Sequence, residues 1–165
     1  MLPIAIDPTV LHIGLAGAGE GLARRSATLA EGGVTPIPVA PNGPLAGLHL
    51  LFVTGLERPL ASALAARARA ASVLVNVEDV PELCDFHVPA TVRRGDLALT
   101  VSTSGKAPGL SRLLREWLER AIGAEWQDRL ERLSQTRAGW RSEGLTPAEV
   151  SRRIRDLVVR EGWLS

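Results

Sequence analysis

Short apolar runs that alternate with helix-forming stretches are the feature of this 165-residue chain that most restricts its fold. Each apolar run ends at glycine or polar residues and is short enough to form one buried strand. Strands are expected at residues 11–16, 48–54, 72–77 and 97–102, and the first two helices at 21–31 and 61–71. The alternation predicts an α/β protein with a Rossmann-like, mostly parallel sheet covered on both faces.

Two further regions complete the predicted architecture. Residues 34–40 are extended, and Pro36 and Pro38 cannot donate hydrogen bonds, which predicts an edge strand. From Pro108 onward the pattern is helical, with an apolar stripe from Leu110 to Ile122, a second helix at 126–139 and a last one to about residue 160. Thr146 followed by Pro147 and Glu149 predicts the start of that last helix.

Composition excludes several classes of protein. The 19 basic and 18 acidic residues nearly cancel, so no overall field favours nucleic acid or an anionic membrane. One cysteine cannot form an internal disulfide, and no apolar run approaches the roughly 20 residues of a membrane span. The N-terminus also lacks a secretory pattern, so we expect a cytoplasmic protein.

A glycine turn follows the first predicted strand. Gly17 and Gly19 match the first two glycines of a dinucleotide fingerprint, in which the helix N-terminus binds pyrophosphate. The third small residue is expected at position 22, but this is Leu22, and Gly21 stands one place early. No acidic residue ends the second strand, so the residues alone leave open a nucleotide site or a plain tight turn.

Other polar clusters allow more than one interpretation. The loop 102–108, with Ser102, Thr103 and Lys106 before a helix, suits carboxylates or phosphates, or is a capped helix start beside a solvated lysine. Cys84 and His87 are too few to hold a metal, so no metal site is expected. Arg24 and Arg25 either reach a cofactor phosphate or are solvated.

The segment 75–119, VNVEDVPELCDFHVPATVRRGDLALTVSTSGKAPGLSRLLREWLE, is more specific. It contains the series N-V-x-D, D-F-x-x-P-A, R-x-G-x-L, a serine-rich loop ending in Pro108, and L-S-R-x-L-R. In this order and spacing it resembles the precorrin-2 dehydrogenase family, which includes the N-terminal module of siroheme synthase and sirohydrochlorin ferrochelatases. The upstream glycine turn fits the same pattern more loosely.

The resemblance implies NAD-dependent oxidation of precorrin-2 to sirohydrochlorin in siroheme biosynthesis, combined in some members with insertion of Fe²⁺ as a substrate. It also implies a homodimer with an NAD-binding domain at 1–79, a dimerisation region at 80–122 and a helical part at 123–165. Asp79 is the implied functional residue, as proton acceptor or substrate orienter. The predicted NAD contacts are Gly17, Gly19, Glu20, Gly21, Pro41, Asn42 and Thr54, and the predicted tetrapyrrole contacts are Asn76, Ser102, Thr103 and Lys106.

The chain departs from the family pattern in its nucleotide half. Only residues 41–48 remain where the family usually has an extra strand and helix, and Gly55 follows Thr54 where two aspartates are common. Glu78 replaces an apolar residue, and we expect its side chain and that of Asp79 to diverge. Two alternatives therefore stay open: a dehydrogenase-deficient homologue that acts as a chelatase or tetrapyrrole-binding protein, and a non-catalytic dimeric scaffold.

Overall fold

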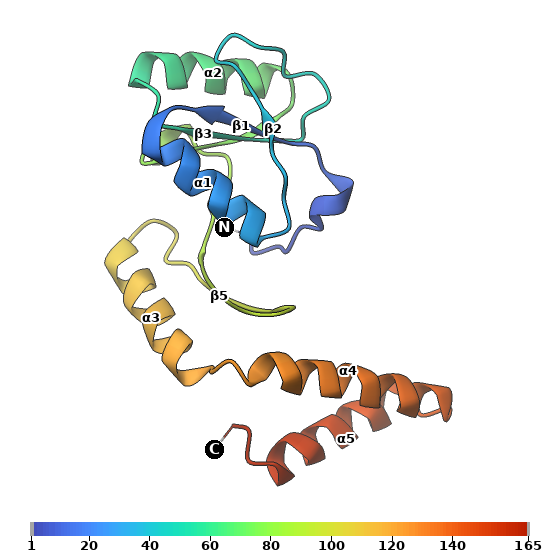
Figure 1. The fold of residues 1–165 in the computed structure, drawn as a ribbon. Coiled ribbons are helices and arrows are strands. Elements are labelled where there is room, and N and C mark those ends of the chain that lie inside the picture. The colour runs from blue at the N-terminus through green and yellow to red at the C-terminus, as the bar shows by residue number, and fades with distance from the viewer. Residues whose placement is uncertain (1, 165) are drawn as a thin grey trace. The chain divides into compact units, whose positions relative to one another are not determined.

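The structure, a computed structural model, describes residues 2–164. They form two compact units that divide between Val88 and Pro89 (Figure 1). Each unit is considered by itself below. The functional division at residues 79 and 122 stays a prediction.

The first unit is a four-stranded parallel sheet in the order β2-β1-β3-β4, as the alternation predicts. Its strands are β1 (Ile13–Gly17), β2 (Ile37–Pro38), β3 (Leu50–Thr54) and β4 (Leu74–Val77), and its helices are α1 (Gly19–Glu31) and α2 (Arg58–Ala70). Alternate residues of β3 point to opposite faces: Leu51 and Val53 lie in the cluster that α2 covers, and Phe52 lies in the one that α1 covers. The α/β prediction is confirmed.

The second predicted strand does lie at a sheet edge, although only Ile37–Pro38 form ladder contacts. No helix or strand follows before β3. Arg67 of α2 holds this short connection by donating to the carbonyl oxygens of Pro41, at 2.6 Å, and Gly43, at 2.5 Å. A hollow of about 580 Å³ lies beside β2, lined by His12 and by residues between 37 and 48.

The segment after β4 covers the other edge of the sheet. A 3-10 helix (Pro81–Leu83) leads to Asp85, whose amide donates to the carbonyl of Val75 at 2.8 Å. The carboxylate of Asp85 accepts from the Val75 amide at 2.9 Å and from Arg69 at 2.8 Å. Asp85 therefore satisfies both backbone groups of an edge residue that no fifth strand pairs.

The second unit begins with a β-hairpin of β5 (Ala90–Arg94) and β6 (Leu97–Val101). The prediction that residues 97–102 form a strand is confirmed, but its placement in the parallel sheet is wrong. Gly95, at φ 58°, and Asp96 form a two-residue connection, which can join only antiparallel neighbours. β5 was not predicted.

Three helices follow in the second unit: α3 (Pro108–Ala121), α4 (Trp126–Ser142) and α5 (Pro147–Arg160). Thr146 and Glu149 form the expected capping box at the start of α5. The rings of Trp126 and Trp163 meet edge to face, and the Arg129 guanidinium lies over both, 5.0 and 5.2 Å from their centres. These two tryptophans thus contribute to packing within the unit.

Candidate functional site

The β1–α1 turn is built from close backbone contacts. A Cβ at Gly17 would collide with the carbonyl oxygen of Thr54, and that oxygen accepts from the Ala18 amide at 3.2 Å. Gly19 has a φ of 64°, and a Cβ there would meet nothing within 4 Å. No side chain caps the first turn of α1. The turn therefore combines one glycine required by packing with one whose surroundings are open.

Gly21 takes the role of the third fingerprint glycine, which is close packing of helix against strand. A Cβ on it would lie 2.5 Å from the hydroxyl oxygen of Thr54 and 3.2 Å from the carboxylate of Glu78. Leu22, in contrast, packs with Ile13 and Phe52 between α1 and the sheet. The residue that seemed one place early is therefore the one in contact with β3.

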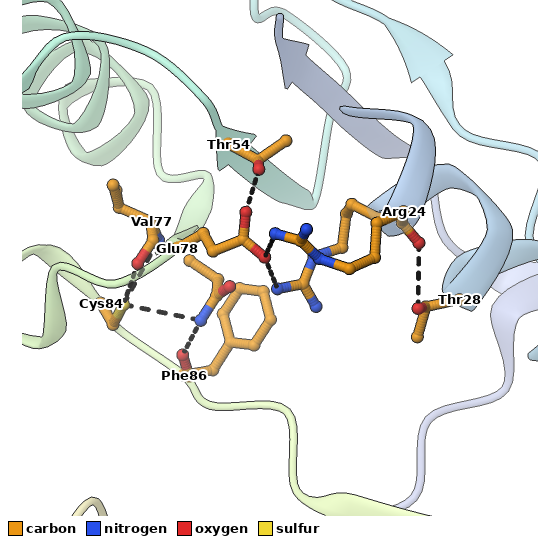
Figure 2. A network of polar contacts seen from close by, with 9 residues as sticks. Arg24, Thr28, Thr54, Val77, Glu78, Cys84 and Phe86 are labelled. Atoms are coloured by element: carbon orange, nitrogen blue, oxygen red, sulfur yellow. Dashed lines mark hydrogen bonds and ion pairs between the residues drawn. The ribbon is translucent and has the colours of Figure 1, made fainter. Parts of the chain in front are cut away.

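A carboxylate lies where these elements meet (Figure 2). One oxygen of Glu78 accepts from the hydroxyl of Thr54, at the end of β3. The other is 3.2 Å from a guanidinium nitrogen of Arg24 and 3.3 Å from one of Arg25, both on α1. The side chains of Glu78 and Arg25 are only 18% and 16% exposed, so they form a mostly buried pair. Arg25 also lies over the ring of Phe52, 5.4 Å from its centre.

The environment of Glu78 favours its charged form. Burial by itself raises the pKa of this carboxyl, but the hydrogen bond from Thr54 and the charges of Arg24 and Arg25 outweigh burial and lower the pKa below its ordinary value. Thr54 is buried, and its hydroxyl is used in this contact. The sequence had suggested that the two arginines contact a cofactor phosphate or solvent, whereas they pair with Glu78.

Asp79 is the next residue, and it lies in a different environment. β4 ends at Val77, and Asp79 is exposed in a turn closed by a 3.3 Å bond from the Val80 amide to the Val77 carbonyl. Its φ of 60° is unusual for a residue other than glycine. Glu78 is mostly buried whereas Asp79 is exposed, so the two residues lie in different surroundings, and the expectation that their carboxylates diverge stays a prediction. The position of Asp79 just after the carboxyl end of a strand is as expected.

Asn76 and Cys84 connect this turn to the segment after it. Asn76 is buried, and its side-chain amide donates to the backbone carbonyl of Phe86 at 2.9 Å. The Cys84 sulfur accepts from the Val77 amide at 3.3 Å and donates to the Val77 carbonyl at 3.1 Å. Burial raises the pKa of the Cys84 thiol. Both side chains therefore hold residues 84–86 against β4, and substrate binding by Asn76 stays a prediction.

The remaining predicted nucleotide contacts lie at the start of α1 and after β2. Glu20 is exposed in the first turn of α1, and Pro41 and Asn42 form a turn in the connection held by Arg67. The carboxyl ends of parallel strands all lie at the same end of a sheet, so Gly17, Thr54 and Asp79 belong to that end. The hollow beside β2 is lined by other residues, namely His12, Gly43, Pro44 and residues 37–40 and 46–48.

The polar loop belongs to the second unit. The hydroxyl oxygen of Thr103 accepts from the Ala107 amide at 3.2 Å and lies 3.0 Å from the hydroxyl of Ser111. Thr103 thus stabilises the start of α3, while Ser102 and Lys106 are exposed. Within residues 2–164, no three or more His, Cys, Asp or Glu side chains gather so as to hold a metal ion. In the same range, no helix combines the length and apolar character needed to cross a membrane.

Two sequence families match this chain in succession. The family described as "Putative NAD(P)-binding" matches residues 41–90, and the one described as "Sirohaem biosynthesis protein central" matches residues 94–121. A solved structure, "SirC, precorrin-2 dehydrogenase", superimposes with a TM-score of 0.78 over 100% of this chain and 93% of that one. At 16% identity, this likeness supports the fold.

Curated relatives carry the name siroheme synthase. The protein of Methylococcus capsulatus is 40% identical over 46% of this chain and 16% of its own length. That of Ectopseudomonas mendocina is 31% identical over 67% of this chain and 28% of its own length. Siroheme synthase 1 of Klebsiella pneumoniae is 41% identical over 54% of this chain and 19% of its own length. The matched region is thus less than a third of each of these relatives. Together with the two family matches, these alignments establish that the chain belongs to the precorrin-2 dehydrogenase family, which includes the N-terminal module of siroheme synthase.

Proposed function

We propose that this protein oxidises precorrin-2 to sirohydrochlorin with NAD as the electron acceptor, in siroheme biosynthesis. The observation that carries the proposal concerns the carboxyl ends of the parallel strands. An open glycine turn and an exposed aspartate in a strained conformation both lie at this end of the sheet. Family membership supports the same assignment.

The β1–α1 turn fits a dinucleotide. The space around Gly19 allows a pyrophosphate to approach the backbone, and the uncapped amides of the first turn of α1 are available as donors. Gly17, Gly19, Glu20 and Gly21 would hold the pyrophosphate through their backbone, with Thr54 beside it. Pro41 and Asn42, in the turn that follows β2, would contact the ribose, where nucleotide-binding proteins of this fold class usually have an acidic residue.

Asp79 supplies the proton acceptor in this proposal. The reaction removes two hydrogens from the macrocycle, one as a hydride and one as a proton. NAD, when bound, accepts the hydride. Asp79 is exposed, and its side chain makes no hydrogen bond or ion pair with another residue of 2–164, so its carboxylate is free to take the proton or to orient the substrate.

The substrate carries several carboxylates, and the second unit offers a cation for them. We expect Lys106, Ser102 and Thr103 to bind acetate or propionate arms, with the exposed ammonium of Lys106 contributing most of the charge. Fe²⁺ would be a further substrate if the protein also inserts metal.

The homodimer expected for this family would use α3. Four large apolar side chains of this helix are 40–63% exposed, at the spacing of a single stripe: Leu110, Leu113, Leu114 and Trp117. A stripe of this kind on one helix is typical of a contact with another protein surface. A second copy of the chain is the partner that the family implies.

Titration with NAD, followed by the NADH absorbance with precorrin-2 generated in place, tests the proposal. We expect NAD binding and NADH formation. Asp79→Asn should fold and bind NAD but lose about 10²- to 10⁴-fold in rate, as is typical of a general acid–base group. Full activity in this variant would remove Asp79 from the mechanism.

NAD titration, together with a metal-insertion assay and calorimetry, separates the alternatives. Metal insertion into sirohydrochlorin without NAD binding would indicate a chelatase that has lost dehydrogenation. A protein that binds neither nucleotide nor tetrapyrrole in calorimetry would be a dimeric scaffold.

A further inference from the structure

The side chain of Glu78 is anchored from two elements that are distant from it in sequence. Thr54, at the end of β3, and Arg24 and Arg25, on α1, all contact its carboxylate. Gly21 makes the room, because a Cβ at this position would come within 3.2 Å of that carboxylate. A mostly buried carboxylate is costly unless it is paired and hydrogen-bonded, and here three donors satisfy that requirement (Figure 2).

The residue that follows this anchor is strained. A left-handed conformation costs an L-residue about 1–2 kcal/mol, and less for aspartate. Such a conformation persists only where the surroundings determine it. On one side of the turn, Cys84 donates to the carbonyls of Val77 and Val80. On the other side, the amide of Glu78 donates to the Val53 carbonyl at 2.9 Å, and the side chain of Glu78 adds the contacts described above.

We propose that Glu78 is a positioning residue for Asp79. Its anchored side chain fixes the first half of the turn on the α1 side of the sheet, and thereby holds Asp79 in the left-handed conformation that leaves its carboxylate exposed at the strand end. This inference rests on the proposed function, in which Asp79 takes a proton from the substrate. It assigns Glu78 no contact with substrate or cofactor.

Glu78→Gln keeps the size of the side chain and an oxygen that can accept from Thr54, but removes the charge that pairs with the arginines. We expect kcat to fall about ten- to a hundredfold, the scale of a small misplacement of a reacting group, while the Kd for NAD stays at its wild-type value. The matched control is Glu82→Gln. It also removes a carboxylate that pairs with an arginine, Arg58, but the Glu82 side chain is 54% exposed. We expect wild-type kcat in this control, because exposed ion pairs contribute little.

A double-mutant cycle distinguishes positioning from a general loss of stability. If Glu78 acts through Asp79, then Glu78→Gln should cause no further loss of rate in the Asp79→Asn background, because the group that it positions is already missing. Wild-type kcat in Glu78→Gln, or losses that simply multiply in the double variant, would overturn the proposal. Should Glu78→Gln fail to fold, Arg25→Gln removes the partner of the same carboxylate whose side chain is only 16% exposed, and unchanged kcat there would have the same meaning.

Amide hydrogen exchange gives a readout that does not depend on activity. In Glu78→Gln we expect loss of protection at the amides of residues 78 and 80, which bond to the Val53 and Val77 carbonyls, with the Val39 amide as an unaffected reference. Retained protection at both would refute the anchoring. If the wild-type protein oxidises no precorrin-2, the proposed function fails, and this measurement still decides whether Glu78 holds the turn.

Discussion

Replacement of Gly21 by alanine tests the packing at the start of α1. In an open helical position, glycine to alanine stabilises by about 0.8–1.0 kcal/mol, because alanine has the higher helix propensity. At Gly21 the new methyl group would lie 2.5 Å from the Thr54 hydroxyl and 3.2 Å from Glu78. Thr54 is only 2% exposed and bonded to Glu78, so it cannot move without disturbing that contact. Overpacking of this kind typically costs about 1–3 kcal/mol.

The two effects oppose each other at Gly21, so the net change ranges from about neutral to a loss of about 2 kcal/mol. Gly139 provides the control, because it lies in α4 and a Cβ there would meet nothing within 4 Å. Gly139→Ala should therefore raise the free energy of unfolding by the full difference in helix propensity, about 1 kcal/mol. Urea unfolding, followed by probes specific to each unit, measures both free energies of unfolding. Equal stabilisation by the two substitutions would refute the close packing of Gly21 against β3.

Three further outcomes are expected. The pKa of Glu78 is lowered in the folded protein, so its charge stabilises the fold at pH values above the ordinary pKa of 4.5, and this stabilisation is lost as the pH falls through the folded pKa. The difference in unfolding free energy between wild type and Glu78→Gln should therefore shrink in acid. A difference that grew in acid would contradict this assignment. Leu113→Arg, at a side chain that is 63% exposed, should leave the stability of the second unit within about 0.5 kcal/mol but weaken self-association in sedimentation, and an unchanged dimer would exclude this face. Lys106→Ala should weaken tetrapyrrole binding in calorimetry and reduce its dependence on salt, whereas an unchanged Kd would remove Lys106 from the substrate site.

Much of the first unit could be predicted because its signals are local. Apolar runs bounded by glycine and polar residues located β1, β3 and β4, and the two prolines identified β2 as an edge strand. In the second unit, the sequence did not identify the β-hairpin. β6 is a short, mostly apolar run of sequence, which resembles another strand of the main sheet although the structure leaves it only partly buried. The two-residue connection at Gly95 is the local signal that could have identified the hairpin.

The candidate site was predictable in part. The sequence by itself determined the α/β alternation, the glycine turn after β1 and an aspartate at the end of β4, because each of these depends on residues within a few positions of one another. Only the tertiary structure decided that Gly21 takes the packing role expected at position 22, and that Glu78 pairs with Arg24, Arg25 and Thr54. Thr54 is 24 positions from Glu78 in the chain and Arg25 is 53, and the order and register of the parallel strands bring them together.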